Sequence, residues 1–298
     1  MSKNKRQYEL WTDIPYSGEN HPPDNPEEPL AGSWRTYFIR HDQDVGFETL
    51  DGRPIKLEIE SPVSVDFEKE LKVVQRVLDN ITEDQITKAQ YWGTGAPTKQ
   101  WTPVADRLID TYGVEAPRAA RILAILQAGI NDAFVVTWYL KYKWIVARPN
   151  QLDQDLVTII CTPRHPSYPS GHAVVSGAAE TILSYFFPAE RKKIRALAEE
   201  NAMSRLFAGV HFPSDNNQGL RLGRQIGEIV INEVEKDHNS AGNAIETPYR
   251  HSRNAVLMPP PYEQVIPYEF DSPCASRTVT SITPQRNNNL PKPKLYVK

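Results

Sequence analysis

Cysteine is nearly absent from the 298-residue chain, which contains only Cys161 and Cys274, far apart in the sequence. So low a count argues against a disulfide framework or a structural zinc site, and it favours a reducing compartment. An excess of one charge is also missing, because the net charge is only −3. The protein therefore has no overall electrostatic field that would recruit nucleic acid. These absences favour a small-molecule substrate over a nucleic-acid partner and leave a homo-oligomer open.

A long uninterrupted apolar run is missing as well. The most apolar windows, 122–138 and 173–187, are broken by polar residues such as Asp132 and Glu180, whereas a membrane span needs about 20 mostly apolar residues. The basic residues 1–8 are not followed by an apolar stretch, so we predict no secretory signal. We therefore expect a soluble, cytoplasmic protein without a membrane span.

The first 60 residues are rich in Pro, Asp, Glu and Gly and show no sustained helical period. They predict an irregular, Pro-rich N-terminal arm (1–60) with short strands near 35–39 and 55–59. Two interpretations of this arm stay open. It is either a disordered leader, or it packs on the following domain through the aromatic residues Trp11, Trp34, Tyr37 and Phe38.

Residues 61–237 have the periodicity of helices. Phe67, Leu71, Val74 and Leu78 recur at three- and four-residue steps, which is the period of an amphipathic helix. The further predicted helices are one opened by a capping box of Thr82 and Gln85, one from Pro117 to about Tyr142, and three at about 172–186, 189–207 and 218–236. The fold class is therefore mainly α, a helical bundle with irregular segments at both ends.

Residues 238–298 lose this periodicity and predict a Pro- and Asn-rich, loosely ordered tail. The tail contains Pro-Pro-Pro-Tyr at 259–262 and an Asn run at 287–289. A proline-rich segment can hold partner proteins. A binding or scaffold protein is therefore one alternative to an enzyme.

Three segments of the predicted bundle carry cations next to groups that bind anions. Lys141, Arg148 and Arg205 would together compensate an oxyanion with two or three charges that is removed from water. Ser170 and Gly171 precede the helix predicted from about residue 172, and unpaired N–H groups at a helix start attract anions. Each feature alone has a plainer explanation, because a single cation is usually solvated and Pro-Ser-Gly-His can be a simple turn.

Two histidines and a carboxylate complete this set. Asp215 follows His211 by four residues, so its carboxylate can fix the imidazole tautomer and raise its basicity. Such a histidine can attack phosphorus or ligate vanadium. His172 lies beside the predicted anion cradle and can act as a general acid or base. A histidine in an Ala-rich helix can also be structural.

The order of these motifs resembles the superfamily that unites type 2 phosphatidic acid phosphatases, bacterial acid phosphatases and vanadium-dependent haloperoxidases. The matching positions, within about residues 132–227, are Lys141, Arg148-Pro149, Pro169-Ser170-Gly171-His172, Ser204-Arg205, His211 and Asp215. The resemblance implies a helical bundle with the anion at one end. It implies that Lys141, Arg148, Ser170, Gly171 and Arg205 hold the oxyanion, that His211 is the nucleophile or axial vanadium ligand, and that His172 moves protons.

Two further residues look like the haloperoxidase branch. Trp138 lies three residues before Lys141, and His165 lies seven residues before His172, where bromoperoxidases have His and chloroperoxidases tend to have Phe. The resemblance assigns both to a halide pocket. Trp138 can instead be a helix-packing residue, and His165 can be a turn residue in the Pro-rich loop.

The resemblance implies two activities. The leading hypothesis is a vanadium-dependent haloperoxidase that oxidises halide with hydrogen peroxide at a bound vanadate cofactor. The alternative is a soluble acid phosphatase that needs no cofactor and hydrolyses phosphomonoesters through a phosphohistidine. One anion cradle serves both, because phosphate and vanadate share charge and tetrahedral shape.

Overall fold

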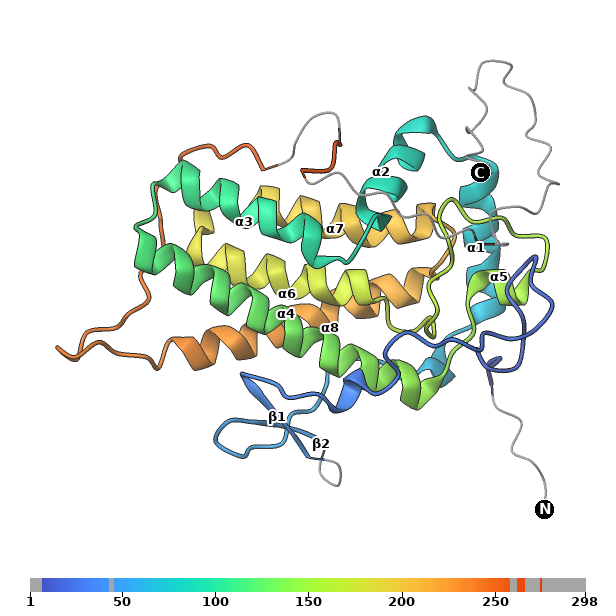
Figure 1. The fold of residues 1–298 in the computed structure, drawn as a ribbon, viewed down its shortest axis with the longest axis horizontal. Coiled ribbons are helices and arrows are strands. Elements are labelled where there is room, and N and C mark those ends of the chain that lie inside the picture. The colour runs from blue at the N-terminus through green and yellow to red at the C-terminus, as the bar shows by residue number, and fades with distance from the viewer. Residues whose placement is uncertain (1–6, 43–45, 258–261, 266–273, 275–298) are drawn as a thin grey trace.

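The computed structural model describes residues 7–42, 46–257, 262–265 and 274. The described chain is mainly helical, with one small hairpin (Figure 1). The elements are η1 (Ala31–Ser33), β1 (Ile39–Asp42), β2 (Gly46–Thr49), η2 (Pro62–Ser64), α1 (Phe67–Asp79), α2 (Glu83–Gly93), α3 (Thr98–Tyr112), α4 (Ala116–Trp144), α5 (Pro149–Leu152), α6 (Gly171–Phe186), η3 (Pro188–Glu190), α7 (Arg191–Phe207) and α8 (Pro213–Val234).

Helix α6 is the centre of the bundle. It packs against α4, α7 and α8, and nearly every residue along it is buried. Glycines bring α6 and α8 close together: a Cβ on Gly223 would lie 2.0 Å from the Val174 carbonyl oxygen, and one on Gly177 would lie 2.4 Å from that of Leu220. The short contact fixes how the N-terminal ends of α6 and α8, which carry candidate site residues, lie relative to each other.

Most of the predicted helices are present. The capping box of Thr82 and Gln85 opens α2 as predicted, and Pro117 stands in the first turn of α4. Helix α3 was not predicted, since Pro103 interrupts its sequence; the structure accommodates this proline inside the helix. Helix α8 begins five residues earlier than predicted, because the Asp215 carboxylate accepts the Phe212 N–H and caps its first turn.

The two strands predicted for the arm are wrong in position. The observed hairpin pairs β1 with β2, with Ile39 opposite Thr49. The segment 55–59 is not a strand. Strand β2 begins at Gly46, whose φ of 95° is a conformation that glycine adopts readily.

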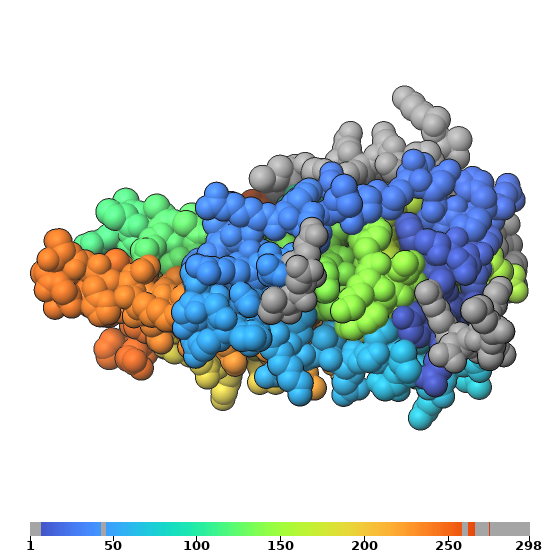
Figure 2. Space-filling model, turned by 90° about the horizontal axis from the view of Figure 1, so that it is seen from below, coloured from blue at the N-terminus to red at the C-terminus, as the bar shows by residue number. Residues whose placement is uncertain are grey.

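The described part of the arm packs along the bundle (Figure 2). Trp11 is buried, whereas Trp34 and Tyr37 are 48% and 57% exposed. The backbone N–H groups of Tyr37 and Phe38 donate to the buried Asp132 carboxylate at 2.9 and 2.7 Å. The arm is therefore held by α4 through backbone hydrogen bonds as well as through aromatic packing.

The expectation for the cysteines is wrong. Cys161 and Cys274 form a disulfide with a Cα–Cα distance of 5.7 Å across 113 positions of sequence. Spacing in the sequence gave no sign of this contact. Disulfides persist mainly in oxidising compartments, so these cysteines no longer favour a reducing one.

The described part of the C-terminal segment contacts the bundle. Ala255 and Leu257 are buried, the Tyr249 N–H donates to the Phe186 carbonyl at 2.8 Å, and the Tyr262 hydroxyl donates to Glu200 at 2.9 Å. The Pro run at 259–261 and the Asn run at 287–289 lie outside the described residues.

The expectation about apolar runs needs one correction. Helix α4 is long and apolar enough, by length and composition, to cross a membrane. The polar residues within α4, such as Asp132, are too few to exclude a membrane span on composition alone. Half of its most apolar window is buried inside the protein, where α4 packs against α6 and α8. A core helix of this kind passes the same test, so α4 is weak evidence for a membrane span.

Candidate active site

The predicted site residues come from separate elements that converge at one end of the bundle. Lys141 lies in the last turn of α4 and Arg205 in the last turn of α7. Arg148 is the N-cap of α5, and Ser170 is the N-cap of α6. His211 and Asp215 flank the start of α8. Six of these side chains are at most 1% exposed: Lys141, Arg148, Ser170, Arg205, His211 and Asp215.

His211 is fixed on both sides of its ring. Its Nδ1 lies 2.7 Å from Asp215 Oδ2, and its Nε2 lies 3.1 Å from Arg148 Nη1. Because a guanidinium only donates, Nε2 carries the lone pair and Nδ1 carries the proton. Burial, together with Arg148 and other nearby cations, holds the pKa of His211 well below its ordinary value. The imidazole is therefore neutral, with Nε2 as its nucleophilic or metal-binding atom.

Asp215 is a buried carboxylate with several donors on one oxygen. Besides His211, Oδ2 accepts the Ser167 hydroxyl at 2.5 Å and the Phe212 N–H at 3.1 Å. Burial raises the pKa of Asp215 to about 6, while these hydrogen bonds and Lys141 oppose the rise. The carboxylate is thus ionised at neutral pH but titrates within two units of it.

Sequence reasoning did not single out Ser167. It stands in the same Pro-rich segment as His165, three residues before Ser170, and its hydroxyl lies 3.5 Å from His211 Nδ1. Its place between two predicted site residues was the available signal. It helps to hold the carboxylate against the imidazole.

Arg148 connects the loop before α6 with the loop before α8. Its Nε donates to the His165 carbonyl at 3.0 Å, Nη1 donates to the Val210 carbonyl at 2.7 Å, and Nη2 donates to His165 Nδ1 at 3.0 Å. Lys141 has a similar role, since its Nζ donates to the carbonyls of Pro166 and Ser167 at 2.6 and 2.7 Å. Burial, with Arg148 nearby, holds the pKa of Lys141 well below its ordinary value.

Arg205 differs from the other two cations. It is buried, yet its Nε, Nη1 and Nη2 have no hydrogen-bond partner among the described residues. A Cβ on Gly93 would lie 3.1 Å from Nη1, so glycine leaves room for the guanidinium at this point. Burial and Arg148 lower the pKa of Arg205 to about 9. Such a group is costly to bury without an anion.

Ser170 and Gly171 form the start of α6, as predicted. The Ser170 hydroxyl accepts the Ala173 N–H at 3.4 Å, and the Ser170 N–H donates to the Asp215 carbonyl at 3.0 Å. The second contact ties the start of α6 to the start of α8. First-turn N–H groups of a helix carry partial positive charge and favour an anion nearby.

His172 follows on the first turn of α6 and is half-buried. Its Nε2 lies 3.1 Å from the Trp92 carbonyl oxygen, so Nε2 carries the proton and Nδ1 is the atom that can accept one. Burial and Arg205 hold the pKa of His172 well below its ordinary value. A neutral imidazole with one free acceptor nitrogen is suited to proton abstraction.

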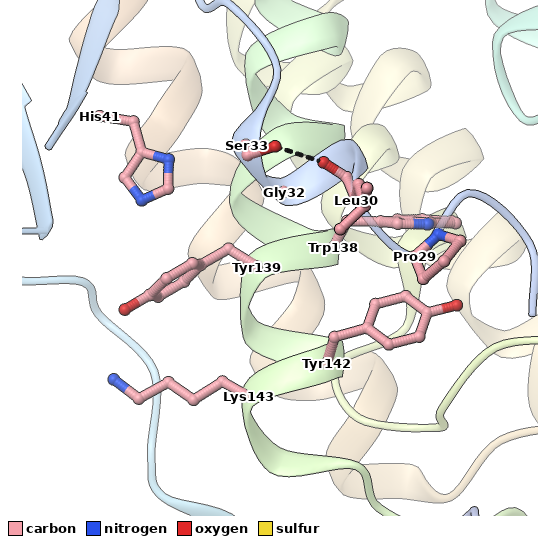
Figure 3. Close-up of a pocket in the computed structure, with 9 residues that line it drawn as sticks. All are labelled: Pro29, Leu30, Gly32, Ser33, His41, Trp138, Tyr139, Tyr142 and Lys143. Carbon is pink, nitrogen blue, oxygen red and sulfur yellow. Dashed lines mark hydrogen bonds between the residues drawn. The ribbon is translucent and has the colours of Figure 1, made fainter. Parts of the chain in front are cut away.

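Trp138 and His165 lie together, with ring centroids 4.8 Å apart. The Trp138 Nε1–H donates to the Glu27 carbonyl in the arm at 3.1 Å. Trp138 also lines a cavity of about 290 Å³ (Figure 3). Its lining consists of Pro29, Leu30, Gly32, Ser33, His41, Trp138, Tyr139, Tyr142 and Lys143.

The donor set fits an oxyanion better than a bare metal cation. No group of three or more His, Cys, Asp or Glu side chains that could hold a metal ion occurs within the described ranges. Lys141, Arg148 and Arg205, which lacks a hydrogen-bond partner among the described residues, instead supply three basic side chains in one buried region. An anion there would give the Arg205 nitrogens the acceptors that they lack.

Comparison with known proteins identifies a family for the central part of the chain. Residues 121–237 match the PAP2 superfamily. The vanadium-dependent bromoperoxidase of Corallina pilulifera is 35% identical over 99 residues, covering 24% of this chain and 17% of that protein. The non-specific acid phosphatase of Providencia stuartii is 31% identical over 114 residues, covering 35% of this chain and 44% of that protein. Each match therefore spans less than half of the relative.

Among solved structures, one described as the first bacterial vanadium-dependent iodoperoxidase is similar over 78% of this chain and 62% of that chain. The TM-score is 0.58 at 24% sequence identity. This likeness shows the fold, a haloperoxidase-type helical bundle, and agrees with the predicted fold class.

Proposed function

The chain carries a PAP2 superfamily domain over residues 121–237, and we propose that it is a vanadium-dependent haloperoxidase. The observation that carries an oxyanion-binding function is Arg205, a buried guanidinium without a partner among the described residues. The proximity of Trp138 to His165 and the likeness to a bromoperoxidase favour halide oxidation. We also propose that residues 61–237 form the catalytic domain, between an N-terminal arm (1–60) and a C-terminal tail (238–298).

The residues that would hold vanadate are those around Arg205. Arg205, Arg148, Lys141 and the start of α6 would hold its oxygens, and His211 Nε2 would ligate the vanadium. Bound vanadate would supply Lewis acidity toward hydrogen peroxide without a change in its own oxidation state. Arg148 Nη1, which donates to His211 Nε2 at 3.1 Å, would transfer that hydrogen bond to the anion.

The protein's own residues would then handle protons and orientation. His172, neutral and with Nδ1 free to accept, would take a proton from hydrogen peroxide. Asp215 would keep His211 in the tautomer that leaves Nε2 unprotonated. Trp138 and His165 would form the wall of the halide pocket.

A second candidate function is phosphomonoester hydrolysis. The neutral His211 Nε2 is also a suitable nucleophile for phosphorus, and an acid phosphatase is among the relatives. His172 would have to donate a proton to the leaving group and then accept one from water.

A paired assay tests the proposal. Purified protein, with and without added orthovanadate, is assayed for peroxide-dependent bromination and for hydrolysis of an aryl phosphate, with His211→Ala as the control. Bromination that requires vanadate, together with vanadate inhibition of hydrolysis, supports the peroxidase. Hydrolysis that vanadate inhibits, without oxidation of bromide or iodide, would make the protein a phosphatase. Full turnover by His211→Ala would refute the site itself.

A further inference from the structure

Glu27 of the N-terminal arm is held against the walls of the candidate site by its backbone. Its N–H donates to the Arg164 carbonyl at 2.7 Å. Its carbonyl accepts the Trp138 Nε1–H at 3.1 Å and the Tyr142 hydroxyl at 2.9 Å. Three hydrogen bonds to two different segments therefore fix where the Glu27 side chain starts, although that side chain itself is 57% exposed.

The carboxylate of Glu27 lies next to His165. Glu27 Oε2 is 3.9 Å from His165 Nε2. His165 Nδ1 faces Arg148 Nη2 at 3.0 Å and the Pro166 carbonyl at 3.2 Å. Arg148 can only donate and the Pro166 carbonyl can only accept, so Nδ1 cannot satisfy both. The shorter contact, with the charged guanidinium, favours Nδ1 as the acceptor and leaves the proton on Nε2. The His165 ring thus turns its Nε2 toward the Glu27 carboxylate, at a distance too long for a direct hydrogen bond.

The charge of Glu27 also acts on the cations of the site. Burial raises the pKa of Glu27, and Arg148 and Lys141 oppose that rise, which indicates that the carboxylate lies within electrostatic reach of both. An anion held by Arg148 and Lys141 would be repelled by this negative charge.

We propose that Glu27 sets the anion selectivity of the candidate site, weakening the binding of doubly charged anions more than that of singly charged ones. The proposal rests on the proposed function, because it assumes that the site receives anions. Coulomb repulsion is proportional to the charge of the incoming anion. The repulsive free energy should therefore be about twice as large for a phosphate dianion as for a halide, so the fold-change in phosphate affinity should be about the square of that in halide affinity.

Glu27→Gln removes the charge and keeps the shape. Because the side chain is exposed and the backbone makes the structural hydrogen bonds, the fold should tolerate the change. Solvent and salt screen the charge, so we expect a moderate gain, roughly twofold to threefold in halide affinity and roughly fourfold to ninefold in phosphate affinity at low ionic strength. Glu28→Gln is the matched control, because it changes the net charge equally one residue away from the carboxylate that lies next to His165.

The first measurement is calorimetric titration of inorganic phosphate, at pH 8 and low salt, into the wild type, Glu27→Gln and Glu28→Gln without vanadate. A tighter dissociation constant for Glu27→Gln, with the Glu28→Gln value near that of the wild type, supports the proposal. Equal values for Glu27→Gln and the wild type would overturn it. A wild type that binds no phosphate would overturn both this proposal and the oxyanion site.

The second measurement uses the vanadate-loaded enzyme. The KM for bromide should fall in Glu27→Gln, whereas the KM for hydrogen peroxide, which is neutral, should not change. A parallel fall in both values would contradict a charge effect. If the wild type binds phosphate but does not oxidise halide, the proposed function fails, and the phosphate titration still decides the role of Glu27.

Discussion

Asp215 fixes the imidazole of His211 through an Oδ2–Nδ1 contact of 2.7 Å at a fully buried position. The contact decides which nitrogen of His211 carries the proton, and so leaves Nε2 as the reactive atom. Ser167 and the Phe212 N–H hold the same carboxylate oxygen. The pair therefore forms a rigid unit at the start of α8, in which the carboxylate acts through the histidine.

Replacement of His211 should reduce activity more than replacement of Asp215. His211→Ala removes Nε2 and should abolish turnover in both the bromination and the hydrolysis assay. Asp215→Asn keeps the shape of the side chain but loses its negative charge and one of its two acceptor oxygens, so it orients Nδ1 less well, and we expect a decrease in kcat of roughly 10- to 100-fold. Steady-state kinetics of both variants checks this order. A smaller loss for His211→Ala than for Asp215→Asn would contradict the assignment of His211.

The pH dependence of activity should report the titration of Asp215. Its pKa is raised to about 6, so its carboxyl becomes protonated as the pH falls through about 6 and can no longer accept the His211 proton. We expect kcat/KM to fall on the acid side of about pH 6 and to be flat just above it. The profile of Asp215→Asn should lack this limb, because an amide does not titrate. An unchanged limb in that variant would assign it to another group.

Arg205→Met should stabilise the fold and remove anion binding at the same time. Arg205 is buried and lacks hydrogen-bond partners among the described residues, and such a charge costs on the order of 1–3 kcal/mol. The free energy of unfolding should rise by about that amount, and phosphate should no longer raise the Tm. Chemical denaturation and thermal melts with and without phosphate measure both effects.

The control for this variant is Arg195→Met on the same helix. Arg195 is exposed and pairs with Glu199, so its loss should change stability little and leave the phosphate effect intact. Destabilisation of Arg205→Met instead would mean that the guanidinium stabilises the empty fold.

The sequence allowed the main helices and the residues of the candidate site to be predicted for identifiable reasons. Helical periodicity at Phe67 and Val74, the capping box at Thr82 and Pro117 at a helix start are local signals. The sequence did not reveal α3, because a proline such as Pro103 normally breaks a helix, whereas here it lies inside one. It also placed the arm's strands wrongly, since their positions follow from the backbone contacts of Tyr37 and Phe38 with Asp132.

Candidate site residues could be listed from the sequence, but their partners could not. Nothing local indicates that Arg148 would contact His211 or that Arg205 would lack a partner, because both facts arise from the way separate loops meet. Glu27 carried no motif at all. Its proximity to His165 depends on the path of the arm across α4, which periodicity does not encode.

The disulfide between Cys161 and Cys274 should stabilise the protein and tie the C-terminal segment to the loop before α6. The bridge closes a loop of 113 residues, and loss of a cross-link of this length costs roughly 2–4 kcal/mol, chiefly by freeing the unfolded chain. The double variant Cys161→Ser/Cys274→Ser should therefore unfold at lower denaturant concentration than the oxidised wild type. Thiol titration of denatured protein should find no free thiol before reduction and two after it. Two free thiols in the unreduced protein would show that the pair is not bridged, and equal unfolding midpoints would show that the bridge adds no stability.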